Sequence, residues 1–210
     1  MSAIIDFDAV AHEYHIGTVR VPSVTTILNG VGLIDFSRVP EPALELGRER
    51  GQKAHTLIQY HLTGELDGDS VDPGLAGYLR AAIEWMRISG FEPTACEHRL
   101  YHPTYHYAGT ADMVGWLGGR PTVLDWKTGR ASDAIADLQL AAYASALAML
   151  PPVSWIDVTP STPVQRLSVE LHPDGTSRSH HYTRPHDFAL FLNCLAIYRE
   201  QERRGVRRTA

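Results

Sequence analysis

The spacing of apolar and polar residues divides the chain into helical and strand segments. Apolar residues recur at helical spacing in several segments, two of which open near Ser23 and Pro42, residues suited to a helix start. The predicted helices cover residues 24–28, 42–62, 75–88, 133–149 and 186–204. The segment 133–149 is rich in alanine, and Ser132 or Asp133 is its expected N-cap.

Strand-like alternation fills much of the remaining chain. Residues 4–21 predict a β-hairpin or two short strands with Gly17 near the turn, and Gly118-Gly119 and Asp174-Gly175 mark later turns. Further strands are predicted at residues 95–101, 107–117, 123–127, 164–171 and 178–183. Together these elements predict an α/β fold with a central mixed β-sheet flanked by helices. We find no repeat or long linker, so residues 1–210 are expected to form a single domain.

The strand at residues 123–127 carries two opposite charges inside an apolar run. Because side chains alternate along a strand, Asp125 and Lys127 share one face. Leu124 and Trp126 share the other, which is the expected core face. Opposite charges are costly to bury without a reason, so this face is a candidate for chemistry.

Turn geometry brings a second carboxylate to the same face. If Gly118-Gly119 forms a two-residue turn, Asp112 lies directly opposite Asp125. A four-residue loop makes the acids diagonal neighbours, and a three-residue loop separates their faces unless a bulge compensates. In the first two registers the carboxylates meet within about 5 to 8 Å, and Mg²⁺ or Mn²⁺ could lie between them. The alternative is a structural Asp125–Lys127 surface pair with an unrelated Asp112.

Two helices carry polar residues at one-turn spacing. Gln139 and Tyr143 share one face of the alanine-rich helix. They either reach a phosphate or the surroundings of the lysine, or they are polar residues at a packing interface. Gly47, Gly51 and His55 form a stripe on an earlier helix, where the glycines allow another backbone or a substrate to come close. A lone histidine on a helix is more often structural than a ligand, and the downstream acids favour the ligand role for His55.

These residues form a resemblance to a known family. They occur in the order Gly51-x-x-x-His55, Gly109-x-x-Asp112, Asp125-x-Lys127-Thr128-Gly129 and Gln139-x-x-x-Tyr143. This order resembles the PD-(D/E)XK nucleases, above all the RecB-like and phage-type exonuclease branch. Tyr14 and the segment 22–25 (PSVT) are also similar to phage-encoded members. The resemblance spans about residues 14–143 and implies a restriction-endonuclease-like nuclease core.

The resemblance implies a metal site. Asp112 and Asp125 would bind one or two Mg²⁺ or Mn²⁺ ions through their carboxylates, and His55 through its imidazole. The backbone carbonyl of Trp126 would complete the protein ligands. An imidazole ligand suits Mn²⁺ somewhat better than Mg²⁺. Glu97 would orient a ligand or a metal-bound water, or it is a surface acid at a strand end.

The resemblance also implies catalytic roles. Lys127 would hold and help activate the attacking water and offset charge on the phosphate. Gln139 and Tyr143 would support the lysine or contact the DNA backbone. Phosphodiester hydrolysis with a metal between carboxylates fits this set of groups.

The overall charge limits how the chain could hold DNA. A net charge of -5 argues against coating nucleic acid through bulk charge, but it leaves a local basic groove open. The candidates for this groove are Arg48, Arg50, Lys53, Arg99 and Arg130, joined by Tyr143. The arginine-rich segment 199–208 is either a solvated helix end or a DNA-backbone contact.

Several classes are excluded or disfavoured by composition. Cys96 and Cys194 are too few for the four-cysteine iron–sulfur cluster of some relatives, and no ATP-binding G-x-x-x-x-G-K-[ST] loop is present. Pro103 disfavours a helical metal site at His102 and His106. No apolar run approaches the roughly 20 residues of a membrane span, and no signal-peptide pattern opens the chain. We expect a cytoplasmic location, in a bacterium or a phage-infected cell.

The sequence therefore predicts a metal-dependent deoxyribonuclease. An exonuclease in DNA recombination, repair or phage DNA processing is favoured. Its expected partner is DNA, and it could also form a homo-oligomer or bind a recombination protein. A catalytically inactive nucleic-acid-binding protein on the same fold is the alternative from another class. A structure-preferring endonuclease is the third possibility, separable by comparing linear with closed circular DNA.

Overall fold

The computed structural model describes residues 5–8, 10–11, 13–34, 39–129, 135–150, 156 and 158–206. Its helices are α1 (Val24–Gly30), α2 (Glu41–Thr63), the 3-10 helix η1 (Gly68–Ser70), α3 (Pro73–Ser89), α4 (Ala136–Leu147) and α5 (Asp187–Arg203). Its strands are β1 (Ile5–Asp8), β2 (Glu13–Ile16), β3 (Val19–Val21), β4 (Glu92–His102), β5 (Tyr107–Leu117), β6 (Arg120–Lys127), β7 (Gln165–Leu171) and β8 (Ser177–His181).

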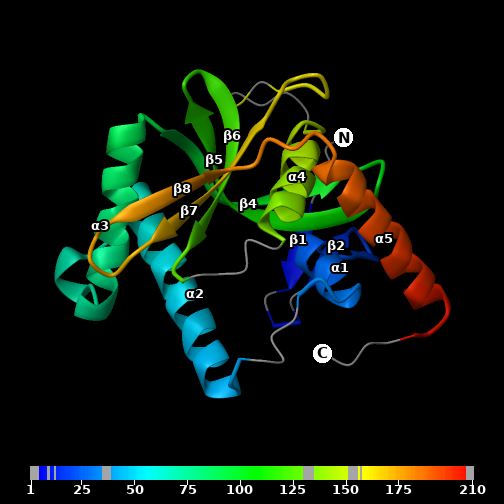
Figure 1. Cartoon of the computed structure of the whole chain (residues 1–210), viewed down its shortest axis with the longest axis horizontal. Coiled ribbons are helices and arrows are strands. Elements are labelled where there is room, and N and C mark those ends of the chain that lie inside the picture. Colours follow the sequence, from blue (N-terminus) through cyan, green and yellow to red (C-terminus); the bar gives the residue numbers. More distant parts are fainter. Residues whose placement is uncertain are drawn as a thin grey trace.

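The central sheet has its strands in the order β4-β5-β6-β7-β8 (Figure 1). β6 and β7 run parallel, and the other neighbouring strands are antiparallel. Helix α4 lies in the connection between β6 and β7, as a parallel crossover requires. The predicted α/β fold with a mixed sheet flanked by helices is confirmed.

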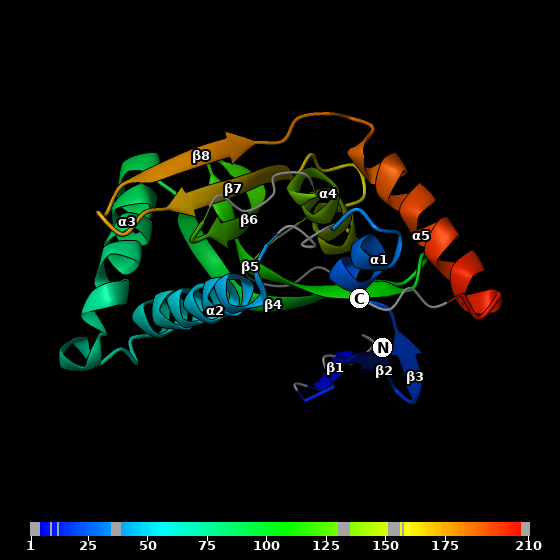
Figure 2. The same ribbon diagram turned by 60° about the horizontal axis from the view of Figure 1, so that its bottom comes forward.

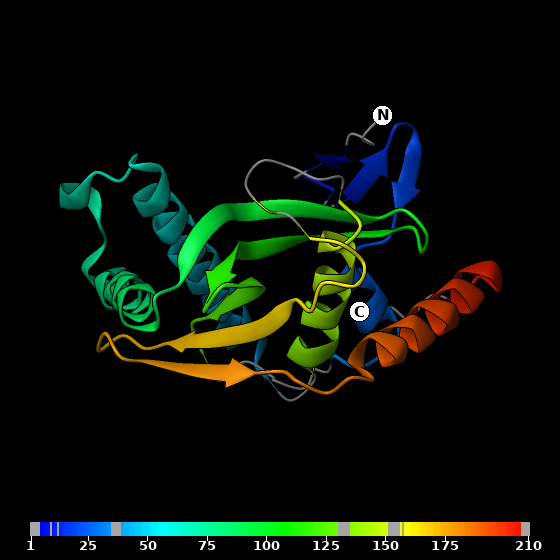
Figure 3. The same ribbon diagram turned by 90° about the horizontal axis from the view of Figure 1, so that it is seen from above.

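Hydrophobic cores cover both faces of this sheet. Helices α2 and α3 pack on one face, where Met113, Leu124 and Trp126 are buried. Helices α1, α4 and α5 pack on the other, where Val114 and Val123 are buried. The expected core face of β6 is confirmed, and its opposite face is also covered. In the view from above, α4 lies between the β4–β5 hairpin and the β7–β8 pair (Figure 3).

Local sequence signals explain most element boundaries. The Ser23 hydroxyl accepts the Thr26 N–H at 2.9 Å and caps α1, as predicted. Gly64 and Gly90, with φ of 75° and 68°, end α2 and α3 in the left-handed conformation that glycine adopts without strain. Helix α4 begins at Ala136, later than predicted, and its expected caps Ser132 and Asp133 lie outside the described residues.

The N-terminal strands form a separate small sheet. β1, β2 and β3 pair antiparallel in that order, with Gly17 at a φ of 60° between β2 and β3. The prediction of a hairpin or two strands counted one strand too few. In Figure 2 this sheet lies beside the β4–β5 hairpin. Within the described part of the chain, no helix combines the length and apolar character that crossing a bilayer requires.

Candidate metal and catalytic site

The β5–β6 hairpin has the predicted two-residue turn. Its pairing runs from Leu117–Arg120 to Met113–Leu124 and ends one position before Asp112 and Asp125. Past this point the Trp126 N–H donates to the Asp112 carboxylate at 2.8 Å. The two strands therefore stop pairing where both acids occur, and a side-chain oxygen takes a backbone N–H at the end of the ladder.

Glu97 comes to the same place from β4. The pairs Cys96–Met113 and His98–Ala111 flank Glu97 and Asp112, so the two acids face each other across the strands. Glu97 has a φ of 47°, in the left-handed region that residues other than glycine rarely adopt. Such strain concentrates at functional positions, where the surrounding structure enforces it.

Helix α2 supplies an imidazole to these acids. His55 Nδ1 lies 3.6 Å from an Asp112 oxygen and 3.9 Å from a Glu97 oxygen. One ligand atom from each of the three residues lies within 4.8 Å of the others, which is close enough to share one ion. The other nitrogen, Nε2, lies 3.0 Å from the Trp126 carbonyl oxygen. A carbonyl only accepts, so in this arrangement Nε2 carries a proton and Nδ1 faces the carboxylates.

Asp125 and Lys127 complete the group, which we call the acid cluster together with His55, Glu97 and Asp112. Lys127 Nζ lies 2.6 Å from Asp125 Oδ2, as their shared strand face predicts. Both side chains are mostly shielded from solvent, Asp125 with 7% exposed and Lys127 with 21%. Close, poorly hydrated charges of this kind interact more strongly than a surface pair.

The acid cluster perturbs its own titration. Burial raises the pKa of Glu97 from 4.5 to about 7, and the charges of Asp112 and Asp125 add to this rise. Burial likewise raises the pKa of Asp112. Burial lowers the pKa of His55, but the three surrounding carboxylates outweigh it and the pKa is raised. When all groups are charged, the three carboxylates face one lysine and one histidine, and a bound cation would relieve this excess of negative charge.

Gln139 and Tyr143 lie together beside the cluster. Gln139 Nε2 donates to the Tyr143 hydroxyl oxygen at 3.2 Å, and both side chains are buried on α4. A Cβ at Gly109 would come within 2.5 Å of the Tyr143 ring, so glycine is needed for the ring's approach to β5. Charges on Asp112 and Asp125 act on the Tyr143 hydroxyl, whose pKa burial raises. The structure therefore brings this pair to the cluster.

The basic residues predicted to form a DNA groove lie in different surroundings. On α2, Arg48 lies 3.9 Å from Glu45 and Lys53 lies 2.6 Å from Glu49, so local acids offset both charges. Arg50 reaches the loop after β6, where a Cβ at Gly129 would lie 3.3 Å from its Nη2. Arg130 lies outside the described residues. Among the described residues, a Cβ at Gly47 would have no neighbour within 4 Å, and one at Gly51 would have ordinary contact with Thr128 alone.

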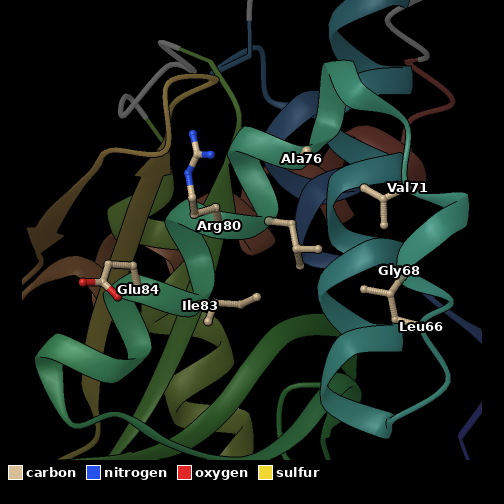
Figure 4. Close-up of a pocket in the computed structure, with 8 residues that line it drawn as sticks. Leu66, Gly68, Val71, Ala76, Arg80, Ile83 and Glu84 are labelled. Atoms are coloured by element: carbon tan, nitrogen blue, oxygen red, sulfur yellow. The ribbon is translucent and has the colours of Figure 1, made fainter.

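Figure 4 shows an apolar pocket of about 380 Å³ that none of the acid-cluster residues lines. It lies between α3 and the segment that precedes it, and its apolar lining includes Leu66, Val71 and Ile83. Arg80 and Glu84 are its charged lining residues. None of the acid cluster contributes to it, so the pocket gives no support to a catalytic role.

A profile of the PD-(D/E)XK nuclease superfamily matches residues 74–193, more than half of the chain. The chain belongs to this superfamily of nucleases, which use divalent metals. Asp112, Asp125 and Lys127 fall inside the matched segment, whereas His55 precedes it. No curated protein matches the chain. The superfamily prediction is confirmed, and the RecB-like branch stays a prediction.

Glu97 is the residue that sequence reasoning left undecided. The observation that could have assigned it to the site is the β4–β5 register, in which His102 pairs with Tyr107 across a four-residue loop. Counting back from that pair puts Glu97 opposite Asp112. The loop contains Pro103 and no glycine-rich turn, so its length could not be read from the sequence.

Proposed function

We propose that the chain is a metal-dependent exodeoxyribonuclease of the RecB-like branch, acting in DNA recombination, repair or phage DNA processing. Residues 1–210 would form one nuclease domain. The single observation that carries the proposal is the convergence of His55, Glu97 and Asp112 from α2, β4 and β5, within 4.8 Å. These residues are distant in sequence, and carboxylates without enough positive charge between them have no evident structural use.

The donors fit a divalent cation. Carboxylate oxygens suit Mg²⁺ and Mn²⁺, and the imidazole moves the preference toward Mn²⁺. We propose His55, Glu97, Asp112 and Asp125 as the side-chain ligands. The Trp126 carbonyl stays a predicted ligand, and its contact with His55 Nε2 supports at least a role in orienting the ring. A bound ion would supply an activated water and neutralise phosphate charge.

Three side chains would assist the reaction beside the metal ligands. Lys127, held at Asp125, would donate a hydrogen bond to the attacking water and to a phosphate oxygen. The attacking water gives up one proton to solvent, its oxygen forms a new bond to phosphorus as the bond to the leaving sugar oxygen breaks, and the sugar oxygen takes up a proton, so each cut consumes one water. Gln139 and Tyr143 would fix the lysine's surroundings or contact the next phosphate.

Linear and closed circular DNA test the proposal directly. We expect the purified protein to degrade linear DNA with Mn²⁺ or Mg²⁺ and to leave closed circles intact. Cutting of the closed circle would contradict the exonuclease and favour an endonuclease. DNA binding without turnover in either metal, across several pH values, would contradict the enzyme and favour an inactive binding protein.

A further inference from the structure

The N-terminal sheet lies on the β4–β5 hairpin next to the acid cluster. Tyr14 and Val21 pack with Ala108 of β5 in a small core of their own. The Tyr14 hydroxyl shares a hydrogen bond of 2.7 Å with the hydroxyl of Thr110, two residues before Asp112. Figures 2 and 3 both show the sheet beside this hairpin. It is therefore a neighbour of the site, although it precedes the segment matched by the family profile.

Arg99 is the first cation along β4 from the cluster. It pairs with Thr110. Arg99 follows Glu97 by two positions on β4, and Thr110 precedes Asp112 by two positions on the antiparallel β5. Two strand residues span about 6.6 Å, comparable with the spacing of neighbouring phosphates on an extended DNA strand. The charges of both Arg99 and Glu97 act on the Tyr14 hydroxyl, which agrees with their closeness.

The guanidinium of Arg99 is held by a ring and left without an acid. Its Cζ lies 5.6 Å from the centre of the Phe7 ring, which itself packs against the Tyr14 ring at a tilt of 40°, with the centroids 4.7 Å apart. Arg99 is exposed, and in the described part of the chain no carboxylate oxygen lies within 4.0 Å of it. Arg48 and Lys53, by contrast, lie against glutamates of their own helix.

We propose that the N-terminal sheet is part of the substrate surface and presents Arg99 to a phosphate next to the scissile one in a DNA strand. The inference rests on the proposed nuclease function and adds a substrate-binding residue to it. The ring of Phe7 orients the guanidinium before DNA arrives, so fewer side-chain rotations are lost on binding. Tyr14 anchors the sheet through Thr110 and thus fixes the distance between Arg99 and the acids.

A competing explanation is purely structural: Arg99 would only cover the Phe7 ring. The two explanations differ in one respect, since only a phosphate contact depends on the charge of a particular linkage in the DNA. Single methylphosphonate linkages, which are uncharged, therefore separate them.

The experiment uses single-stranded oligonucleotides with one methylphosphonate at each position around the cut. For the native protein, neutralising a phosphate adjacent to the scissile one should lower kcat/KM by about 10- to 100-fold, the cost of one charged hydrogen bond. Arg99→Gln should lose a similar factor on unmodified DNA and lose nothing further at that linkage. Arg99→Lys, which keeps the charge, should recover part of the loss.

Binding gives a second measurement that does not require turnover. The salt dependence of affinity for single-stranded DNA should fall in slope by about 0.7 in Arg99→Gln, as one lost phosphate contact predicts. Arg87→Gln, which removes an exposed arginine paired with Glu84 on α3, serves as the control and should leave slope and rate unchanged.

The proposal is overturned if Arg99→Gln, with an unchanged melting temperature, remains as sensitive as the native protein to every neutral linkage. It is also overturned if that variant cleaves and binds unmodified DNA normally. Failure of the nuclease function looks different, because the native protein would then show no metal-dependent cleavage of any oligonucleotide, while the salt-slope comparison could still be made.

Discussion

Two clusters of acids among the described residues, each with at least one buried carboxylate, are compensated in different ways. In the arginine cluster (Asp137, Arg166, Arg184 and Asp187), Arg166 donates to Asp187 at 3.0 Å and Arg184 lies 3.5 Å from it. Arg184 also lies 3.7 Å from Asp137, so two arginines meet two acids. In the acid cluster, the carboxylates of Glu97, Asp112 and Asp125 meet Lys127 and a histidine.

The difference lies in how much of each cluster's negative charge the protein itself balances. The arginine cluster joins β7 to the starts of α4 and α5, and no external ion is needed to balance it. In the acid cluster, three carboxylates face one lysine and one histidine and two carboxyl pKa values are raised, which fits the proposed cation. Variants in the arginine cluster should therefore act mainly on stability, whereas variants in the acid cluster should act mainly on activity.

The largest effect is expected in the arginine cluster. Asp187 is fully buried, so Asp187→Ala leaves the Arg166 charge without its partner and should lower the free energy of unfolding by about 3–5 kcal/mol. Urea unfolding measures this change. Glu200→Ala, which breaks an exposed pair on the same helix, is the control and should change little. Equal, small effects of both variants would mean that the buried cluster is not structural.

Loss of the lysine should affect the reaction more than the fold. If Lys127 donates to the scissile phosphate as proposed, Lys127→Met should lower single-turnover cleavage by about 100- to 1000-fold. Its melting temperature should fall, because the shielded Asp125 carboxylate loses its partner, so cleavage is measured at a temperature where both proteins are folded. Cleavage within a few-fold of the native rate would show that Lys127 has no part in catalysis.

Removal of one acid should separate stability from metal binding. Asp112→Asn keeps the acceptor for the Trp126 N–H but removes one of three converging charges. Without metal, the free energy of unfolding should rise by about 0.2–1 kcal/mol, because like charges repel less. Calorimetry should show Mn²⁺ affinity reduced by more than about 100-fold, beyond the effect of an outer-shell partner. A destabilised variant with unchanged Mn²⁺ affinity would mean that Asp112 is structural and not a metal ligand.

A pH dependence of stability is expected in the absence of metal. The folded Glu97 carboxyl has a pKa of about 7 against an ordinary 4.5, so the folded state holds the proton more tightly. Stability from this group is present below pH 4.5 and is lost as the pH rises toward 7. The raised pKa of His55 acts in the same direction. Melting temperatures with EDTA should fall across this range more than those with Mn²⁺; parallel curves would count against a metal at these groups.

Much of the local structure could be predicted because its causes are local. Ser23 caps α1 through a residue three positions away, and Gly64 ends α2 with its own backbone. The Gly118-Gly119 turn determined the β5–β6 register, and with it the meeting of Asp112 and Asp125 at the end of the ladder. Alternation alone brought Lys127 to the same face as Asp125.

The sequence by itself determined the elements, the turn register and the residue types suited to metal-assisted hydrolysis, since these depend on neighbours along the chain or across one tight turn. Tertiary structure decided which acids join the histidine. It brought His55 from α2, turned Glu97 inward through a left-handed backbone, and packed the N-terminal sheet beside the site. These contacts join segments separated by long loops, whose closure depends on packing of the whole chain and leaves no local periodicity to read.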